Sequence, residues 1–293
     1  MIDARILPAL HARLARALSP PAVPLFPLEI DGARVGELTQ QRVERISAFS
    51  DVFDVDPLRV KFAAGCSTFD ARTAAMERVA RALAAEGALS AWRDERYEVR
   101  AGPEHPTAFL VERAAARYFG VLTAAVHVNG LVDDDGRVSM WIARRSATKA
   151  IDPGLLDNLV GGGMAAGASV ARTLEKEAWE EAGIDARLAS QARSAGVVSI
   201  RLLHSDGLQN ETIHVHDLWL PRDFTPANQD GEAIGHRLVP LDEIPALLAN
   251  ADGEDVMTAD ASLVALDALI RLGSIDADDP FHPWLAALCG EGR

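Results

Sequence analysis

Three glutamates stand close together in a segment that opens with a run of glycines. Glu177, Glu180 and Glu181 are spaced i, i+3 and i+4, so a helix carries all three carboxylates on one face. Like charges on one face repel each other, and a hard divalent cation such as Mg²⁺ or Mn²⁺ relieves the repulsion because it takes oxygen ligands. A solvated acidic face is the ordinary explanation of such a run. The glycines at 161–163 and the following Gly183 favour a metal site instead.

The whole segment 160–184 resembles the Nudix box, G-x5-E-x7-R-E-U-x-E-E-x-G-U, in which U is bulky and apolar. The matching positions are Gly162, Glu177, Glu180, Glu181, Gly183 and Ile184. Three positions depart from the pattern, namely Ala168 for the first Glu, Lys176 for the Arg and the small Ala178. Lys176 keeps the positive charge but lacks the bidentate fork of arginine. The resemblance implies hydrolysis of a diphosphate bond with Mg²⁺ or Mn²⁺ as the cofactor.

The resemblance extends over most of residues 25–275. It points to a Nudix subfamily with an extra N-terminal domain, related to the region attached to thiamine pyrophosphokinase in fungi. The segments that carry it are 92–97, 111–114, 127–130, 141–146, 153–159 and 261–273. This subfamily implies thiamine diphosphate, or its oxidised or damaged analogues, as the substrate. Two alternatives stay open: a nucleoside diphosphate derivative such as ADP-ribose or an oxidised nucleotide, and a binding module without activity, suggested by Ala168.

The site residues follow from the glutamates and from the resemblance. Glu180 and Glu181 are the expected metal ligands, and Glu177 is a ligand or an acceptor for metal-bound water. The resemblance adds the backbone carbonyl of Gly161 as a metal ligand. We expect Glu232, in a loop after the box, to act as general base, with Glu211 as its rival. Either residue could equally be an exposed loop carboxylate, and the metal alone could activate water.

Basic and aromatic side chains before the box are candidates for binding the substrate. Arg144, Arg145 and Lys149 are placed to hold phosphate, although a solvated basic turn explains them nearly as well. Trp92 and Tyr97 could stack on a heteroaromatic ring, but a buried aromatic at a domain seam is the more ordinary role.

A pair of histidines in one strand, His214 and His216, alternates onto one face and could bind metal. No third ligand lies at a usable spacing, so we favour an ordinary structural role for both.

The elements that position these residues predict an α+β protein with a Nudix fold, a mixed sheet sandwiched between helices, after an N-terminal α+β domain. Two strands, 121–132 and 138–143, precede the glycines, which we read as a loop that opens the box helix. Strands follow at 195–203, 212–220 and 237–241, then helices at 244–250 and 259–272. The expected division is an N-terminal domain at 1–115, a Nudix hydrolase domain at 116–275 and a tail at 276–293.

Further elements are expected in the N-terminal part. Residues 1–18 read as an amphipathic helix, 28–38 as a hairpin that turns at Asp31 and Gly32, and 39–49 as a helix. A strand over 55–63 and a helix over 70–86 follow. A loop-rich stretch then leads to the boundary near residue 115.

Composition sets the class of partner. The 293 residues carry a net charge of −14, which argues against non-specific binding to nucleic acid or to acidic membranes. Cys66 and Cys289 lie far apart and form no metal-binding pattern, which indicates a reducing compartment. The sequence has no signal-peptide core and no apolar run of about 20 residues. We therefore expect a cytoplasmic enzyme with a small diphosphate substrate; a homodimer is left open.

Overall fold

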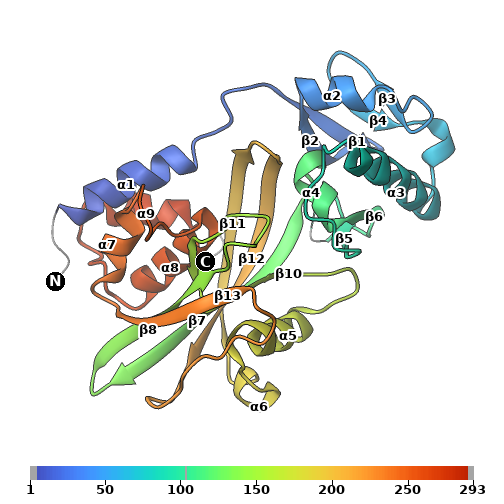
Figure 1. Ribbon diagram of the computed structural model, residues 1–293. Helices are drawn as coiled ribbons and strands as arrows, with labels where there is room; N and C mark the ends of the chain where they lie inside the picture. The colour runs from blue at the N-terminus through green and yellow to red at the C-terminus, as the bar shows by residue number, and fades with distance from the viewer. Residues whose placement is uncertain (1–4, 103, 290–293) are drawn as a thin grey trace.

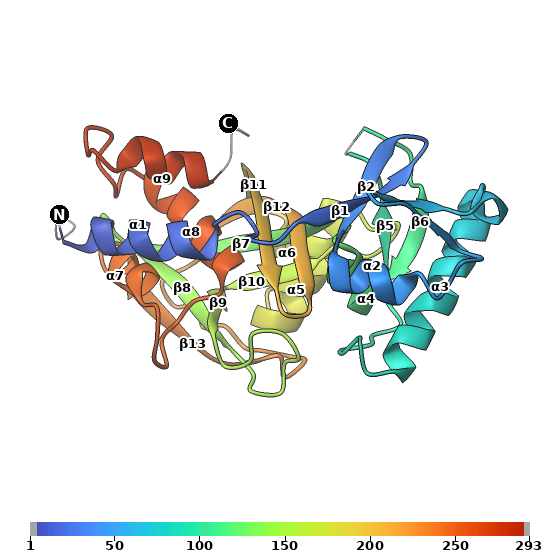
Figure 2. The same cartoon turned by 90° about the horizontal axis from the view of Figure 1, so that it is seen from above.

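The computed structural model describes residues 5–102 and 104–289 and shows two lobes (Figures 1 and 2). The small lobe, residues 25–119, packs one face of a four-stranded sheet of order β2-β1-β4-β3 against helices. Its strands are β1 (Leu25–Ile30), β2 (Ala33–Thr39), β3 (Phe53–Val55), β4 (Val60–Phe62) and the separate pair β5 (Arg96–Val99) and β6 (Phe109–Glu112). Its helices are α2 (Gln40–Ile46), η1 (Ala64–Cys66), α3 (Phe69–Ala85) and α4 (Arg113–Phe119).

Local signals predict much of the small lobe correctly. The hairpin β1–β2 turns at Asp31 and Gly32, whose φ angles of 52° and 81° match a primed turn. The side chain of Thr68 accepts a hydrogen bond from the amide of Ala71 and caps α3, so the predicted helix is confirmed. The single strand predicted over 55–63 is wrong. The Asp56 carboxylate accepts hydrogen bonds from the amides of Leu58 and Arg59, which makes a turn there, and the chain folds into the hairpin β3–β4.

The large lobe is built on a seven-stranded mixed sheet. Its strands run in the order β11-β12-β7-β8-β13, with β10 paired to β7 and β9 paired to β8. The pair β12–β7 is parallel and the other pairs are antiparallel. The strands are β7 (Thr123–Asp134), β8 (Arg137–Arg145), β9 (Leu156–Asn158), β10 (Val160–Gly163), β11 (Arg193–His204), β12 (Gly207–Trp219) and β13 (Ala233–Pro240).

Helices cover both faces of this sheet, as the predicted fold requires. One face packs against α7 (Ile244–Ala249), α8 (Ala259–Arg271) and α9 (His282–Leu288). The other face packs against α5 (Val170–Ala182) and α6 (Ala186–Ala189). Alternate residues of β7 serve the two cores: Ala125 and Leu131 face the first, and Val126 and Val128 face the second. The mixed sheet between helices is therefore confirmed.

The helix α1 (Ile6–Ala17) precedes the small lobe but packs on the large one (Figure 1). Its Arg13 guanidinium donates hydrogen bonds of 2.6 Å to the carbonyls of Leu248 and Met257. At the other end of the chain, Leu285 of α9 is buried in the same core. The domain division at residues 115 and 275 stays a prediction, and these contacts join α1 and the tail to the large lobe.

Two further predictions concern the whole chain. Cys66 and Cys289 are buried in the cores of different lobes and form no disulfide with each other. Over the ranges that the structure describes, no helix is both long enough and apolar enough to cross a bilayer.

Candidate functional site

The box helix α5 presents the three glutamates at its C-terminal half. The helix begins where the Ser169 hydroxyl accepts a hydrogen bond from the amide of Arg172, and it ends at Gly183 in the left-handed region. The Glu177 and Glu181 side chains are 14% and 11% exposed, whereas that of Glu180 is 34% exposed. The predicted helix and its stop at Gly183 are confirmed.

The glycines lie mainly in a strand, β10, and not in the loop that we predicted. β10 pairs with β7 and brings backbone close to α5, where the Gly161 amide donates a 2.8 Å hydrogen bond to Glu181 Oε2. A Cβ atom at Gly162 would lie 2.3 Å from Cδ of Glu177. Glycine at this position is therefore what allows the helix carboxylate to rest against the strand.

Two of the carboxylates share one ammonium group. Lys176 Nζ lies 2.8 Å from Glu177 Oε1 and 2.8 Å from Glu180 Oε2. The two oxygens thus converge on a single positive charge. The lysine that departs from the box pattern holds the glutamates together, as the usual arginine could.

A second ammonium joins the third box glutamate to the predicted general base. Lys149 Nζ lies 3.6 Å from Glu181 Oε1 and forms an ion pair with Glu232. Arg93 also contacts Glu232, at 3.0 Å. Glu232 is therefore brought to the box, whereas its rival Glu211 bonds Thr123 and Gln209 on another wall of the site.

Burial and the two lysines act in opposite directions on the pKa values of Glu177, Glu181 and Glu232. Burial raises the pKa of Glu181 to about 8, although Lys149 acts in the opposite direction. Burial also raises the pKa of Glu177, against the charge and hydrogen bond of Lys176. Burial opposes ionisation of Glu232 as well, but the hydrogen bond and charge of Lys149 outweigh it and lower the pKa of Glu232.

The raised pKa of Glu181 predicts a pH-dependent cost to stability. In the unfolded chain this carboxyl ionises near its usual 4.5, whereas in the fold it holds its proton up to about pH 8. Stability therefore falls as the pH rises from about 4.5 to 8 and then levels off. In chelator, Glu181→Gln should raise Tm by roughly 3–6 °C at pH 8 and by much less at pH 5. Glu180→Gln, at the partly exposed neighbour, is the control; an equal gain at both pH values would contradict the assignment.

The donor set fits a hard divalent cation. As the side chains stand, no group of three His, Cys, Asp or Glu residues within the described ranges is arranged to hold a metal. The carboxylate pair Glu177 and Glu180 nevertheless converges on one cation, and Glu181 and Glu232 meet at another. Oxygen ligands of this kind suit Mg²⁺ or Mn²⁺.

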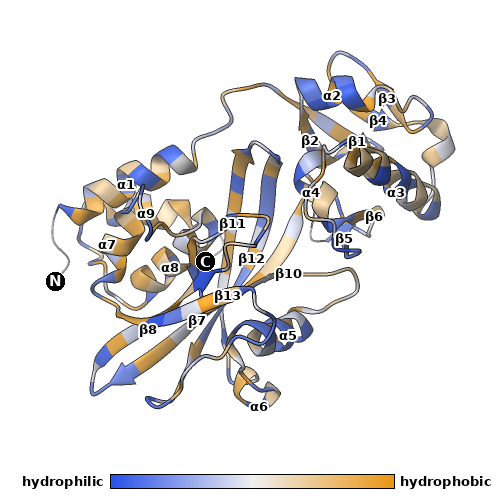
Figure 3. Ribbon diagram, in the orientation of Figure 1, coloured by the Kyte–Doolittle hydropathy of each residue, from blue (hydrophilic) through white to orange (hydrophobic). Residues whose placement is uncertain are grey.

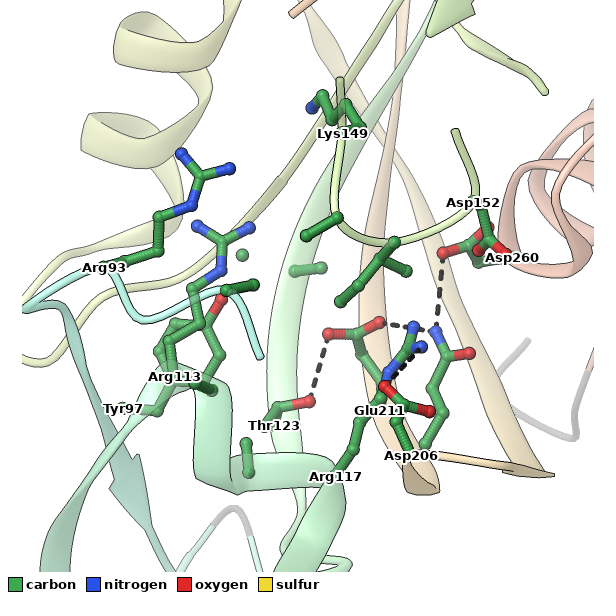
Figure 4. Close-up of a pocket in the computed structure, with 18 of the residues that line it drawn as sticks. Arg93, Tyr97, Arg113, Arg117, Thr123, Lys149, Asp152, Asp206, Glu211 and Asp260 are labelled. Carbon is green, nitrogen blue, oxygen red and sulfur yellow. Dashed lines mark hydrogen bonds and ion pairs between the residues drawn. The ribbon is translucent and has the colours of Figure 1, made fainter. Parts of the chain in front are cut away.

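A cavity of about 160 Å³ lies between the two lobes, on the border of β10 (Figure 4). Its walls include the glycines 161–163 and Lys149, which link it to the box, although the side chains of the three box glutamates do not line it. The small lobe contributes Tyr97, Arg93 and Arg113. The cavity thus joins the seam between the lobes to the glycine strand of the box.

The predicted substrate-binding residues divide into two groups. Tyr97, Arg145 and Lys149 line the cavity, whereas Arg144 and Trp92 do not. Arg144 instead donates a 3.0 Å hydrogen bond to the carbonyl of Gly154 and pairs with Asp255. Arg145 holds Asp157 at 2.5 Å and the carbonyls of Ile151 and Asp152, so it braces the segment that carries Lys149.

The two aromatic candidates also differ. Trp92 packs in the small-lobe core, with the Arg81 guanidinium 4.9 Å from its ring centroid and its Nε1 donating to Asp94. Tyr97 is buried, and its hydroxyl oxygen lies 2.0 Å from the position that a Cβ atom at Gly163 would take. Trp92 therefore contacts only the small lobe in these interactions, whereas Tyr97 lies at the seam between the lobes and borders the cavity.

Several lining residues had no sequence signal. Figure 4 shows Arg93 and Arg113 on one side of the cavity, Lys149 at its top, and acidic side chains on the other side, with Arg117 lying among them. The acidic wall is Asp152, Asp206, Glu211 and Asp260. Burial raises the pKa of Asp152, and the nearby charge of Asp260 adds to the shift. These residues come from separate segments of the chain, so no spacing along it could have grouped them.

A buried histidine was also missed. His127 of β7 lies opposite Gly161 and lines the cavity, and its Nδ1 is 2.8 Å from Asn158 Oδ1. Burial opposes protonation, but the charges of Asp260 and Asp157 raise the pKa of His127. The predicted strand pair behaves differently: burial lowers the pKa values of His214 and His216, and neither lines this cavity.

Comparisons with known proteins identify the family of this chain. Residues 121–260 match the family model for the NUDIX domain, and residues 15–123 match a domain of unknown function, DUF4743. Nudix hydrolase 24, chloroplastic, of Arabidopsis thaliana is 37% identical over 87% of this chain and 70% of its own length. Nudix hydrolase 20, chloroplastic, of the same plant is 35% identical over 85% of this chain and 68% of its own length. A solved Deinococcus radiodurans structure, covering 58% of this chain and 97% of its own, has a TM-score of 0.44 at 22% identity.

The mixed sheet between helices and the box helix with its glycine strand define a Nudix fold. The chain belongs to the Nudix hydrolase family, and it is a hydrolase with an additional N-terminal domain.

Proposed function

We propose that this hydrolase is a pyrophosphohydrolase that depends on Mg²⁺ or Mn²⁺ and cleaves a diphosphate bond in a small molecule. The observation that carries the proposal is the convergence of four glutamate side chains on two lysine ammonium groups next to β10. Glu177 and Glu180 meet at one ammonium group, and Glu181 and Glu232 meet at the other. A cluster of glutamates held by two lysines beside a cavity suits a metal-assisted reaction on an anionic substrate.

Each residue has a defined part in this proposal. Glu177, Glu180 and Glu181 would hold the metal, together with the Gly161 carbonyl. The bound metal would neutralise the diphosphate and so lower the barrier to attack by water on phosphorus. Glu232 accepts the proton of that water, because its pKa is lowered and its carboxylate is held at the box by Lys149. Arg93 and Arg113 lie at the cavity side where phosphate charge would enter.

The acidic wall supports a substrate whose organic half carries positive charge or hydrogen-bond donors. We therefore propose thiamine diphosphate, or an oxidised or damaged analogue, as the substrate class. The diphosphate would face Lys149 and the arginines, and the thiazolium of the compounds that keep it would face Asp152 and Glu211. The oxo analogue has a neutral thiazolone ring and would offer that wall only the amino group of its pyrimidine. ADP-ribose and oxidised nucleotides are the competing class, since their bases bring no fixed positive charge to that wall.

The test is a screen for hydrolysis products with Mg²⁺, separated by chromatography, because ADP-ribose yields two phosphomonoesters and no free phosphate. Thiamine diphosphate and its oxy and oxo analogues are compared with ADP-ribose, an oxidised nucleotide and a simple alkyl diphosphate. The proposal expects the highest kcat/KM with a thiamine-type compound and no hydrolysis in chelator. A clear preference for a nucleotide would overturn the substrate, and no hydrolysis of any diphosphate would overturn the reaction.

Asp152→Asn separates recognition of the organic half from chemistry. Asp152 has a φ of 49°, a backbone conformation that asparagine tolerates, so the fold is kept. Removing one negative charge from the wall should raise KM for thiamine diphosphate about five- to tenfold, with little change for the alkyl diphosphate. Asp31→Asn, at the distant β1–β2 turn with a φ of 52°, is the matched control. Equal effects on both substrates would contradict a specificity role.

We infer a reducing compartment, such as the cytoplasm, from two buried cysteines that do not pair with each other. The net charge of −14 supports a small-molecule partner over nucleic acid. Localisation of the tagged full-length protein in its own cells tests the compartment, and binding to nucleic acid at low salt would contradict the partner class.

A further inference from the structure

Lysine is scarce in this chain, and two of its positions lie at the box glutamates and Glu232. Among 29 basic residues there are three lysines, Lys61, Lys149 and Lys176. Two of these three place their ammonium groups on the carboxylates of the box and of the general base. Arginine holds carboxylates through a fixed planar fork, whereas lysine is a single charge on a flexible stem. The two cations at the box are thus lysines, whose flexible stems change position more readily than an arginine fork.

Lys149 reaches the carboxylates from a different part of the fold. It lies in the segment between β8 and β9, and its side chain is 11% exposed. The backbone around it is fixed, because the Ser146 amide donates 2.8 Å to the carbonyl of Glu232 and Arg145 holds the carbonyl of Ile151. Only the side chain of Lys149 has to rotate to change its contacts.

The ammonium of Lys149 lies 3.6 Å from Glu181 Oε1 and is paired with Glu232, so a metal bound by Glu181 would come close to it. A divalent cation and an ammonium cannot share the same carboxylate oxygens closely, because their charges repel. Binding of the metal to Glu181 therefore displaces Lys149. The same side chain lines the cavity, at its top in Figure 4.

We propose that Lys149 works in two positions. Without metal, it bridges Glu181 and Glu232 and stands in for the missing cation. With metal bound, its ammonium turns into the cavity and contacts the substrate's diphosphate. Metal binding thereby creates the phosphate-binding group, so that substrate binds well after the metal is in place. This inference rests on the proposed metal-dependent function.

Metal affinity tests the proposal. If Lys149 blocks the metal site, removing its charge strengthens Mn²⁺ binding; if Lys149 supports the site, removing it weakens Mn²⁺ binding. A protein whose site is blocked most of the time binds its ligand correspondingly more weakly. Lys149→Met should therefore bind Mn²⁺ about tenfold more tightly than wild type, measured by calorimetry without substrate. Lys149→Arg should bind Mn²⁺ more weakly, because the fork holds the carboxylates harder. Lys61→Met is the matched control and should match wild type.

The second position is read from the lysine side chains and from substrate binding. Labelled with ¹³C at Cε, the chain has three lysine side-chain signals, which Lys61→Met, Lys149→Met and Lys176→Met assign. Mg²⁺ should shift the Lys149 signal, and a non-hydrolysable diphosphate should shift it again only when Mg²⁺ is present. Lys149→Met should raise KM at least tenfold despite its tighter metal binding.

The outcomes separate this inference from the function on which it rests. The two-position role is overturned if folded Lys149→Met binds Mn²⁺ with unchanged or lower affinity. It is also overturned if Mg²⁺ does not shift the Lys149 signal. Hydrolysis by the wild-type protein would remain valid in both cases. If Lys149→Met does not fold, tighter or unchanged Mn²⁺ binding by Lys149→Arg overturns the two-position role equally. A wild-type chain that binds no Mn²⁺ and hydrolyses no diphosphate removes both the role and the proposed function.

Discussion

Glu180→Gln and Glu181→Gln are each expected to lower kcat by about 10³-fold or more at saturating Mg²⁺. Each change removes one anionic ligand and with it part of the stabilisation of charge on the transferring phosphoryl group. Glutamine keeps the shape of the side chain, and the helix that carries both residues is fixed by Ser169 and Gly183. The fold should therefore survive, as circular dichroism and thermal unfolding would show.

The control for these two variants lies on the same helix. Glu175→Gln removes a negative charge at an exposed position that has no match in the box. Its kcat should stay within about twofold of wild type. Near-wild-type turnover by both Glu180→Gln and Glu181→Gln, or full activity in excess chelator, would contradict the metal site.

Gly162→Ala should cost about 10²-fold in kcat while the protein remains folded. The added Cβ would lie 2.3 Å from Cδ and 2.4 Å from Cγ of Glu177, so this side chain has to leave its place against β10. A ligand that is misplaced by about 1 Å loses much of its effect on the reaction. Steady-state kinetics and Mn²⁺ binding measure the loss.

Gly65→Ala is the comparison for this substitution. Gly65 has open space around its Cβ position, so the methyl group meets nothing. This variant should match wild type in kcat and in Mn²⁺ affinity. If Gly162→Ala also keeps wild-type kcat, the close contact between strand and helix has no part in catalysis.

The box helix could be predicted because its signals are local. The cap at Ser169, the glutamate spacing and the stop at Gly183 all lie within a few turns of chain. The glycines before it were read as a loop, although they pair with β7. Pairing depends on a strand some 30 residues earlier in the sequence, and glycine gives no strand signal of its own.

The partners of the glutamates could not be predicted for a related reason. Lys176 was recognised as a substitute for arginine because it is adjacent in sequence, but the bridge from Lys149 to Glu232 needs three separate segments to meet. The same applies to Arg93 and Arg113, which the small lobe delivers across the cavity. Arg144 shows the converse: next to Arg145 in sequence, it points to Asp255 instead.

The position of α1 has a consequence for synthesis on the ribosome. Arg13 bonds the carbonyl of Leu248, 235 residues further along the chain, so α1 emerges long before its partners exist. Until α7 and α8 have been translated, the apolar face formed by Leu7, Leu10 and Leu14 has no core to enter. The small lobe can complete its own core meanwhile, since that core draws only on residues 26–121. Docking of α1 is therefore a late, long-range step, and the nascent helix is a natural client for chaperones that shield exposed apolar segments.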